Sequence, residues 1–329
     1  MSFEQLTPDA ILNTVEEAAE IKLTGLTVAL PSYINRVYEL RAKDGTKLIA
    51  KFYRPARWTR QAIEDEHAFV LDCQEAELPV VAPLLFPNKS TLAEHDGILF
   101  SLFPKRAGRQ LEINTDDDWT RLGSIIARMH VCGAKRKAEH RIVIGPMQSA
   151  QNDVDHLCSS VIPGRMSEQF ALMAKKLIDA SGPLFKGAEC IRIHGDCHRG
   201  NILDRLEEGL LLIDFDDMAM GPPIQDMWLL LPDRADKSYL EIDLFIEGYE
   251  QFREFDRASV RCIESLRAMR MIYFLAWCGK QQNDFVFKRN FPDWGSDPFW
   301  QREINDLQEQ LGFVLDAANS SNGQTSFNS

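Results

Sequence analysis

The feature that most constrains this chain is an eight-residue polar stretch, His194-Gly195-Asp196-Cys197-His198-Arg199-Gly200-Asn201. Short apolar segments at 190–193 and 210–213 predict strands on either side of it. The second segment runs directly into Asp214-Phe215-Asp216-Asp217. The pattern therefore predicts a loop between short strands that gathers carboxylate and carboxamide oxygens, which are the hard ligands that Mg²⁺ prefers.

The spacing of these oxygens indicates one kind of chemistry. Asp196 and Asn201 are five positions apart, the offset between the base and the metal-binding asparagine of a protein-kinase catalytic loop. Asp214 opens Asp-Phe-Asp where a kinase has Asp-Phe-Gly. We therefore expect an ATP-dependent phosphotransferase in which Asp196 accepts the proton of the substrate hydroxyl or orients that hydroxyl, while Asn201 and Asp214 bind Mg²⁺.

Two histidines in the loop allow a different reading, a zinc hydrolase. His194 and His198 have the i, i+4 spacing of the HExxH motif, which requires a helix and a glutamate after the first histidine. Gly195 follows His194 and Gly200 lies just beyond, so a helix is not expected here. We expect His194 to brace the loop, and the sequence assigns no role to His198.

Composition excludes several classes of protein. The 329 residues carry 49 acidic and 37 basic side chains, a net charge of −12, which argues against non-specific binding to nucleic acids or anionic membranes. The seven cysteines form no CxxC pair and fit a reducing compartment. No leader pattern and no apolar run of about 20 residues is present, so a soluble cytoplasmic protein is expected.

Hydrophobic periodicity predicts an α+β, two-lobed, protein-kinase-like fold with a small antiparallel-sheet N-lobe and a larger helical C-lobe. The expected N-lobe strands are 26–30, 36–42, 47–53 and 98–103, with a hairpin turn at Asp44-Gly45 and helices at 8–21 and 61–74. Helices are expected after Thr115 and at 166–178, 224–231, 240–252, 260–277 and 299–315. We divide the chain into an ATP-binding lobe (1–105), a catalytic lobe (106–316) and a disordered tail (317–329).

The N-lobe supplies further candidates. Lys51 is the one cation in the apolar stretch 48–53 and is expected on the ATP phosphates, paired with Glu66 of the following helix, or with Glu64. No glycine-rich phosphate loop is present. In its place, the connection around Ser32 either contacts a phosphate or is a plain hairpin. Asp226, at a helix start, is expected to hydrogen-bond the catalytic-loop backbone or to stabilise its own helix.

These motifs resemble the aminoglycoside-phosphotransferase and choline-kinase superfamily, whose signature is HGDxHxxN followed by a strand and an aspartate. Most of the chain shares the resemblance. The segments 51–58, 194–198 and 266–270 look most like a bacterial branch of cytosolic serine/threonine protein kinases tied to stress survival. The resemblance implies Asp196 as proton acceptor, Asn201 and Asp214 as Mg²⁺ ligands, and Ser32 in contact with ATP.

The sequence says less about which molecule accepts the phosphoryl group than about the reaction itself. Gly195 replaces the arginine that pairs with an activation-loop phosphate in protein kinases, and only twelve positions separate Asp214 from Asp226. We therefore expect no activation by phosphorylation in that segment. A small-alcohol kinase of the choline, homoserine or aminoglycoside type remains the alternative, with Trp277, Trp294 and Trp300 as core residues or as a cation pocket. A pseudokinase binding module is a third reading, and a monomer is the simplest assembly.

Overall fold

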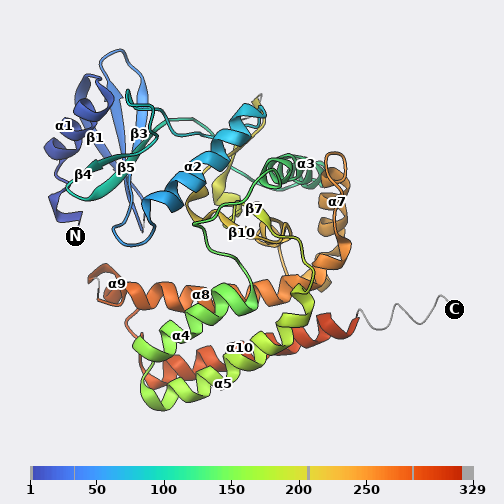
Figure 1. Ribbon diagram of the computed structural model, residues 1–329. Coiled ribbons are helices and arrows are strands. Elements are labelled where there is room, and N and C mark those ends of the chain that lie inside the picture. Colours follow the sequence, from blue (N-terminus) through green and yellow to red (C-terminus); the bar gives the residue numbers. More distant parts are fainter. Residues whose placement is uncertain (1–2, 33, 206–207, 284, 321–329) are drawn as a thin grey trace.

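The computed structural model shows two lobes, a sheet-containing N-lobe and a helical C-lobe (Figure 1). It describes all residues except 1–2, 33, 206–207, 284 and 321–329. The expected α+β, kinase-like architecture is confirmed, because sheet and helices segregate along the chain as the periodicity indicated.

The N-lobe is built on a five-stranded antiparallel sheet in the order β1-β2-β3-β5-β4. Its strands are β1 Leu23–Leu30, β2 Arg36–Ala42, β3 Lys47–Phe52, β4 Ala93–His95 and β5 Ile98–Pro104. Gly45 takes the left-handed φ of 94° that the tight β2–β3 turn requires. The apolar residues Ile11 and Val15 of α1 (Pro8–Ala19) pack into the core of this lobe. Helix α2 (Arg60–Glu75) lies between the sheet and the C-lobe in Figure 1.

The C-lobe is a layered set of helices with two small sheets at its upper edge. Its longer helices are α3 Asp116–Gly133, α4 Gln151–Ser160, α5 Gly164–Ser181, α7 Tyr239–Tyr249, α8 Ile263–Gln281 and α10 Asp297–Ser320, and the short ones are α6 Gln225–Trp228 and α9 Phe285–Asn290. Strand β7 (Ile191–Ile193) pairs with β10 (Ala219–Gly221), and β8 (Ile202–Asp204) pairs with β6 (Arg109–Gln110) and β9 (Leu210–Leu212). These short strands hold the catalytic loop between them.

Several element boundaries differ from the sequence expectation. Helix α10 continues to Ser320, so residues 317–320 of the expected disordered tail are helical, and the rest of that tail lies outside the described residues. Helix α4 was not expected, and α6 covers only four of the residues predicted to be helical at 224–231. Trp300 is fully buried, which confirms it as a core residue rather than part of a cation pocket. In the described part of the chain, no helix is long and apolar enough to cross a membrane.

Helices α3 and α7 pack closely against each other at Gly248. A Cβ added at Gly248 of α7 would overlap the backbone carbonyl oxygen of Thr120 in α3. The hydroxyl of Ser124 also donates to the carbonyl of Gly248 over 3.1 Å. Because backbone atoms cannot move aside cheaply, even a methyl group forces the two helices apart.

We therefore expect Gly248→Ala to lower the free energy of unfolding by about 1–3 kcal/mol, the usual cost of an overpacked interior. The matched control is Gly312→Ala in α10, where an added Cβ meets no atom within 4 Å. That control should be neutral or raise stability by about 0.5–1 kcal/mol, because alanine is the better helix former. Chemical denaturation of both variants tests this; equal effects would contradict the close helix contact.

Candidate active site

A cavity of about 500 Å³ lies between the lobes and contains most of the residues singled out from the sequence. Its N-lobe wall includes Ser32, Lys51 and Glu66, and its C-lobe wall includes Asp196 and Asp214. Apolar side chains also line the cavity, among them Leu30, Val37, Ile49, Val70, Phe103, Leu203, Ile213 and Phe215. An apolar cavity with a few convergent polar groups is the usual form of a small-ligand site.

The catalytic loop is held in place by Asp226, which is completely buried. Its carboxylate accepts hydrogen bonds from the backbone N–H groups of His194 (2.7 Å) and Gly195 (2.8 Å). The same carboxylate lies 3.1 Å from Nε2 of His130, whose Nδ1 is 2.9 Å from the hydroxyl of Tyr249. The expected hydrogen bonding of Asp226 to the loop backbone is confirmed, and α3 and α7 anchor it through His130 and Tyr249.

The two loop histidines have separate tasks. His194 Nε2 lies 2.9 Å from the carbonyl oxygen of Ile213, and its ring is tilted against Phe215 at a centroid distance of 4.4 Å. This confirms His194 as a brace between the loop and the Asp-Phe-Asp segment. His198 accepts from the N–H of Gly200 over 3.0 Å and lies 3.6 Å from Asp196. The backbone from 194 to 198 is not helical, so the two imidazoles do not share a helix face as a zinc motif requires.

Asp196 and Asp214 line the cleft, and Asn201 is a buried residue hydrogen-bonded to the backbone of Asp196. The amide nitrogen of Asn201 donates to the carbonyl oxygen of Asp196 over 3.0 Å, which leaves its amide oxygen as the atom suited to a cation. Asp214 adopts a left-handed backbone, φ 59° and ψ 67°, and its side chain is 54% exposed. Non-glycine residues rarely take this conformation, although Asp does so more readily than most, and active sites are among the places where it occurs. Asn201 and Asp214 thus offer two hard oxygen donors, a set that fits Mg²⁺.

Lys51 contacts two carboxylates of the Asp-Phe-Asp segment rather than the expected glutamate. Its Nζ lies 3.0 Å from Asp214 and 3.2 Å from Asp216. Burial favours the neutral amine, yet these two carboxylates hold the pKa of Lys51 well above its ordinary value. Among the described residues Lys51 does not form the predicted direct ion pair with Glu66, although the Glu66 carboxylate is near enough to raise the pKa of Lys51 as well. The physical reason is Asp216, which stands where kinases have glycine and brings a second carboxylate to the lysine.

Glu66 lies beside Arg141 instead. Its carboxylate is 3.5 Å from the Arg141 guanidinium and is almost completely buried. Glu64 is solvent-exposed, so it does not replace Glu66 at the cleft. Burial raises the pKa of Glu66 to about 7, with Lys51 and Arg141 opposing that rise.

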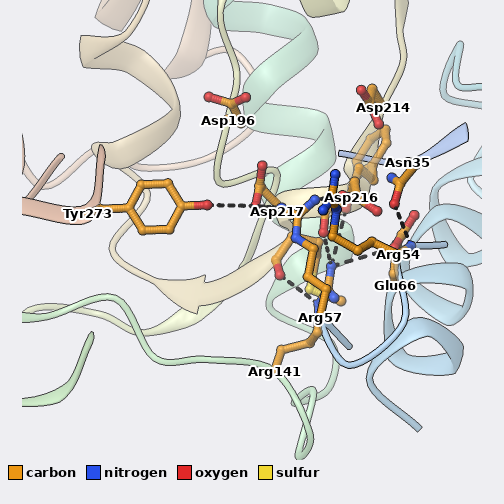
Figure 2. Close-up of polar contacts among 12 residues, drawn as sticks. Asn35, Arg54, Arg57, Glu66, Arg141, Asp196, Asp214, Asp216, Asp217 and Tyr273 are labelled. Atoms are coloured by element: carbon orange, nitrogen blue, oxygen red, sulfur yellow. Dashed lines mark hydrogen bonds and ion pairs between the residues drawn. The ribbon is translucent and has the colours of Figure 1, made fainter. Parts of the chain in front are cut away.

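Two arginines to which the sequence assigned no role, Arg57 and Arg141, hold the Asp-Phe-Asp-Asp segment (Figure 2). Arg57, in the loop after β3, forms ion pairs with Asp216 and, over 2.6 Å, with Asp217. Arg141 donates to the carbonyls of Asp216 (2.6 Å) and Met218 (2.7 Å). Although burial opposes ionisation, Lys51, Arg57 and Arg141 lower the pKa of Asp216 to about 2. The sequence did hold one indication of these arginines. Asp216 and Asp217 follow Asp214 closely, and buried carboxylates need cationic partners.

A third arginine contacts the candidate base. Arg270 of α8 donates to Asp196 over 2.8 Å, and one helical turn later the hydroxyl of Tyr273 donates to Asp217 over 3.4 Å. Figure 2 shows Tyr273 pointing toward Asp217, with Asp196 nearby. Helix α8 thus supplies two polar contacts to the acidic side of the cleft.

Ser32 lines the cleft next to Leu30 and Pro31 at the end of β1. Tyr33, the next residue, lies outside the described residues. The buried side chain of Asn35 accepts from the backbone N–H of Arg54 over 3.0 Å and fixes the end of this connection. The position of Ser32 is compatible with a phosphate contact, which stays a prediction.

The fold and this cleft together define a phosphotransferase. The model of the phosphotransferase enzyme family (APH) matches residues 27–263, most of the chain, so this protein belongs to that family. It is therefore a kinase in the broad sense, an enzyme that transfers a phosphoryl group.

Among curated proteins, the chain is similar to stress response kinase A of Escherichia coli (strain K12), with 37% identity over 317 residues and 94% of each chain covered. It is equally similar, with the same identity and coverage, to the serine/threonine protein kinase RdoA of Salmonella typhimurium (strain LT2). Among solved structures, the amicoumacin kinase hAmiN, in complex with AMP-PNP, Ca²⁺ and Ami, shares the fold with a TM-score of 0.71. That match has 16% identity and covers 92% of this chain and 93% of the other.

The segment between Asp214 and Asp226 has no residue that a kinase could phosphorylate on a hydroxyl, because it contains no serine, threonine or tyrosine. It is also tightly packed, with a 3₁₀ turn at Phe215–Asp217 followed by β10. The expectation that this segment is not a phosphorylated activation loop therefore has a direct chemical basis.

The raised pKa of Glu66 leads to a pH-dependent stability. Between its ordinary pKa of 4.5 and the folded value of about 7, the folded protein binds a proton that the unfolded chain has released. The contribution of Glu66 to the free energy of unfolding is thus fully present below pH 4.5 and is lost as the pH rises through about 7. Relative to Glu66→Gln, which cannot titrate there, wild-type unfolding free energy should fall by about 2 kcal/mol between about pH 5 and pH 8.

Urea titrations of the two proteins at both pH values measure this difference, and comparison with the variant removes the contributions of His67 and other groups common to both. A wild-type minus variant difference that does not change with pH would show that Glu66 is already ionised at the lower pH.

Proposed function

We propose that this chain is an ATP- and Mg²⁺-dependent serine/threonine protein kinase that acts in a bacterial stress response. The observation that carries the catalytic part is that Lys51, Asp196 and Asp214 line one inter-lobe cleft, with Asn201 hydrogen-bonded to the backbone of Asp196. The protein acceptor and the stress response are supported by the names of the two curated relatives. Seven cysteines in free form fit a reducing cytoplasm.

In this proposal the serine or threonine oxygen attacks the γ-phosphorus of ATP. The bond from that phosphorus to the β,γ-bridging oxygen breaks, its electron pair leaves with ADP, and Asp196 takes the hydroxyl proton. Arg270 holds the Asp196 carboxylate in one orientation over 2.8 Å. Asn201 and Asp214 would hold Mg²⁺, which neutralises phosphate charge.

In this proposal Lys51 binds the phosphates of ATP through an ammonium group that is held in place and stays charged. Its pKa, held well above the ordinary value by Asp214 and Asp216 despite burial, keeps it charged at all physiological pH values. Asp216 also lines the cleft, but its side chain is only 7% exposed. Its ion pairs with Lys51 and Arg57 indicate that it positions these two cations.

A small-alcohol kinase is the second candidate. The observation in its favour is the short Asp214–Asp226 segment, because protein kinases use a long activation loop as a platform for peptides. Several solved structures that share the fold are named as kinases of small molecules, such as the microcompartment-associated aminopropanol kinase, at a TM-score of 0.67 and 17% identity. A pseudokinase is the weaker third candidate, because binding alone does not need Asp196.

Substitution of Asp196 by asparagine tests the catalytic assignment. We expect Asp196→Asn to lower the rate of phosphoryl transfer by about 10²–10⁴-fold, since it removes the proton acceptor, while ATP affinity stays unchanged. The matched control is Asp236→Asn at an exposed position outside the cleft, which should retain full activity. Transfer from labelled ATP and equilibrium nucleotide binding are the two measurements.

The same assay distinguishes the candidate functions when generic proteins and a panel of small alcohols are offered in parallel. Label in protein serine or threonine that disappears with Asp196→Asn supports the proposal. Turnover of one small alcohol at a far higher kcat/KM contradicts the protein-kinase assignment. ATP binding with no transfer to any acceptor would identify a pseudokinase.

A further inference from the structure

A second cavity, larger than the nucleotide cleft, opens beside it at the junction of the lobes. It measures about 980 Å³, against about 500 Å³ for the cleft, and the two share Ile34, Arg57 and Trp277. We call it the basin. Its walls are the N-terminal turn at Phe3, the start of β2, the loop after β3, residues 142–153, and α8 from Tyr273 to Gln281. In Figure 1 the N-terminal turn faces the end of α8.

The basin leads to the groups proposed to react. Tyr273 lines it and donates to Asp217, and one helical turn earlier Arg270 contacts the candidate base Asp196. Arg57 on the shared wall is bonded to Asp216 and Asp217. Asp196 itself lines the cleft and not the basin, so a substrate lying in the basin would present its hydroxyl to Asp196 across the wall that the two cavities share.

The charge of the basin is opposite to that of the molecule. Four cations line it, Arg36, Arg54, Arg57 and Lys280, against one carboxylate, Asp153, although the whole chain carries a net charge of −12. Arg36 and Lys280 form no ion pair with any carboxylate whose side chain is described. Arg36 instead lies over the ring of Phe3, 4.9 Å from its centroid, and Lys280 is exposed.

The one acid, Asp153, is half-buried. Burial raises its pKa to about 6, with Lys280 as the opposing influence, so it stays largely ionised at neutral pH and the four cations still outnumber it. A cationic acceptor such as an amino alcohol would meet repulsion from this surface, whereas an anionic acceptor is attracted. The aromatic rings of Phe3, Trp58, Tyr273 and Trp277 add apolar contact area between the cations.

We propose that the basin binds an acidic segment of the protein substrate next to the serine or threonine that is phosphorylated. The proposal rests on the protein-kinase function above and deepens it by giving the substrate class. The breadth of the basin, about twice the volume of the cleft, fits a stretch of peptide better than a single alcohol. Arg36 and Lys280 are the residues that select for negative charge, since Arg57 is already bonded to two aspartates.

The test compares the wild type with the double variant Arg36→Glu/Lys280→Glu on serine peptides of equal length with acidic, neutral or basic flanks. For the acidic peptide we expect KM to rise at least about tenfold in the variant, because two attractions become repulsions, with KM for ATP unchanged. Wild-type KM for that peptide should also rise with salt. The matched control is Arg41→Glu/Lys176→Glu, which makes the same charge change on β2 and on a helix outside the basin. Melting temperatures of both variants check folding.

Each outcome bears on one of the two proposals. Preference for the acidic peptide that the Arg36/Lys280 variant alone reverses supports the basin. Peptide phosphorylation without charge preference, or an equal effect of both double variants, overturns the basin and leaves the protein-kinase function standing. Transfer only to a small alcohol, such as a phosphorylated sugar offered in the same panel, overturns the protein-kinase function and the peptide site with it.

Discussion

The ion cluster at the lobe junction, largely buried except for Asp214, is the interaction on which this structure depends. Lys51 and Arg57 come from the N-lobe, Arg141 comes from the segment after α3, and Asp214, Asp216 and Asp217 come from one short C-lobe turn. Charges removed from water are costly unless opposite charges meet them. The cluster therefore gives the two lobes a defined relative orientation, because any other would leave several of these groups unpaired.

A second polar network holds the catalytic loop independently of that cluster. Asp226 binds the loop backbone, and His130 and Tyr249 connect it to α3 and α7. The close glycine contact between those helices places His130 and Tyr249 where they can meet. Thus helices α3 and α7, which are distant in sequence from the catalytic loop, help to determine where Asp196 lies.

Local pattern was sufficient for much of the fold and for the main cleft residues. The β2–β3 hairpin, the helix after Thr115 with its capping box, and the bracing by His194 and Asp226 follow from turn chemistry, caps and motif spacing. The partner of Lys51 could not be predicted in this way. Pairing in a buried cluster is decided by all the charges present, and the roles of Arg57, Arg141 and Arg270 depend on contacts between residues 70 to 160 positions apart.

Gly195 limits how this enzyme can be regulated. It has a left-handed φ of 82°, and a Cβ at this position would overlap the backbone carbonyl of Asp217. In protein kinases an arginine at this place reads the phosphate of the activation loop. No single substitution can introduce that arginine here, because the neighbouring turn would first have to be rebuilt. The scaffold is therefore sterically closed to phosphate-sensing by a side chain at this position of its catalytic loop.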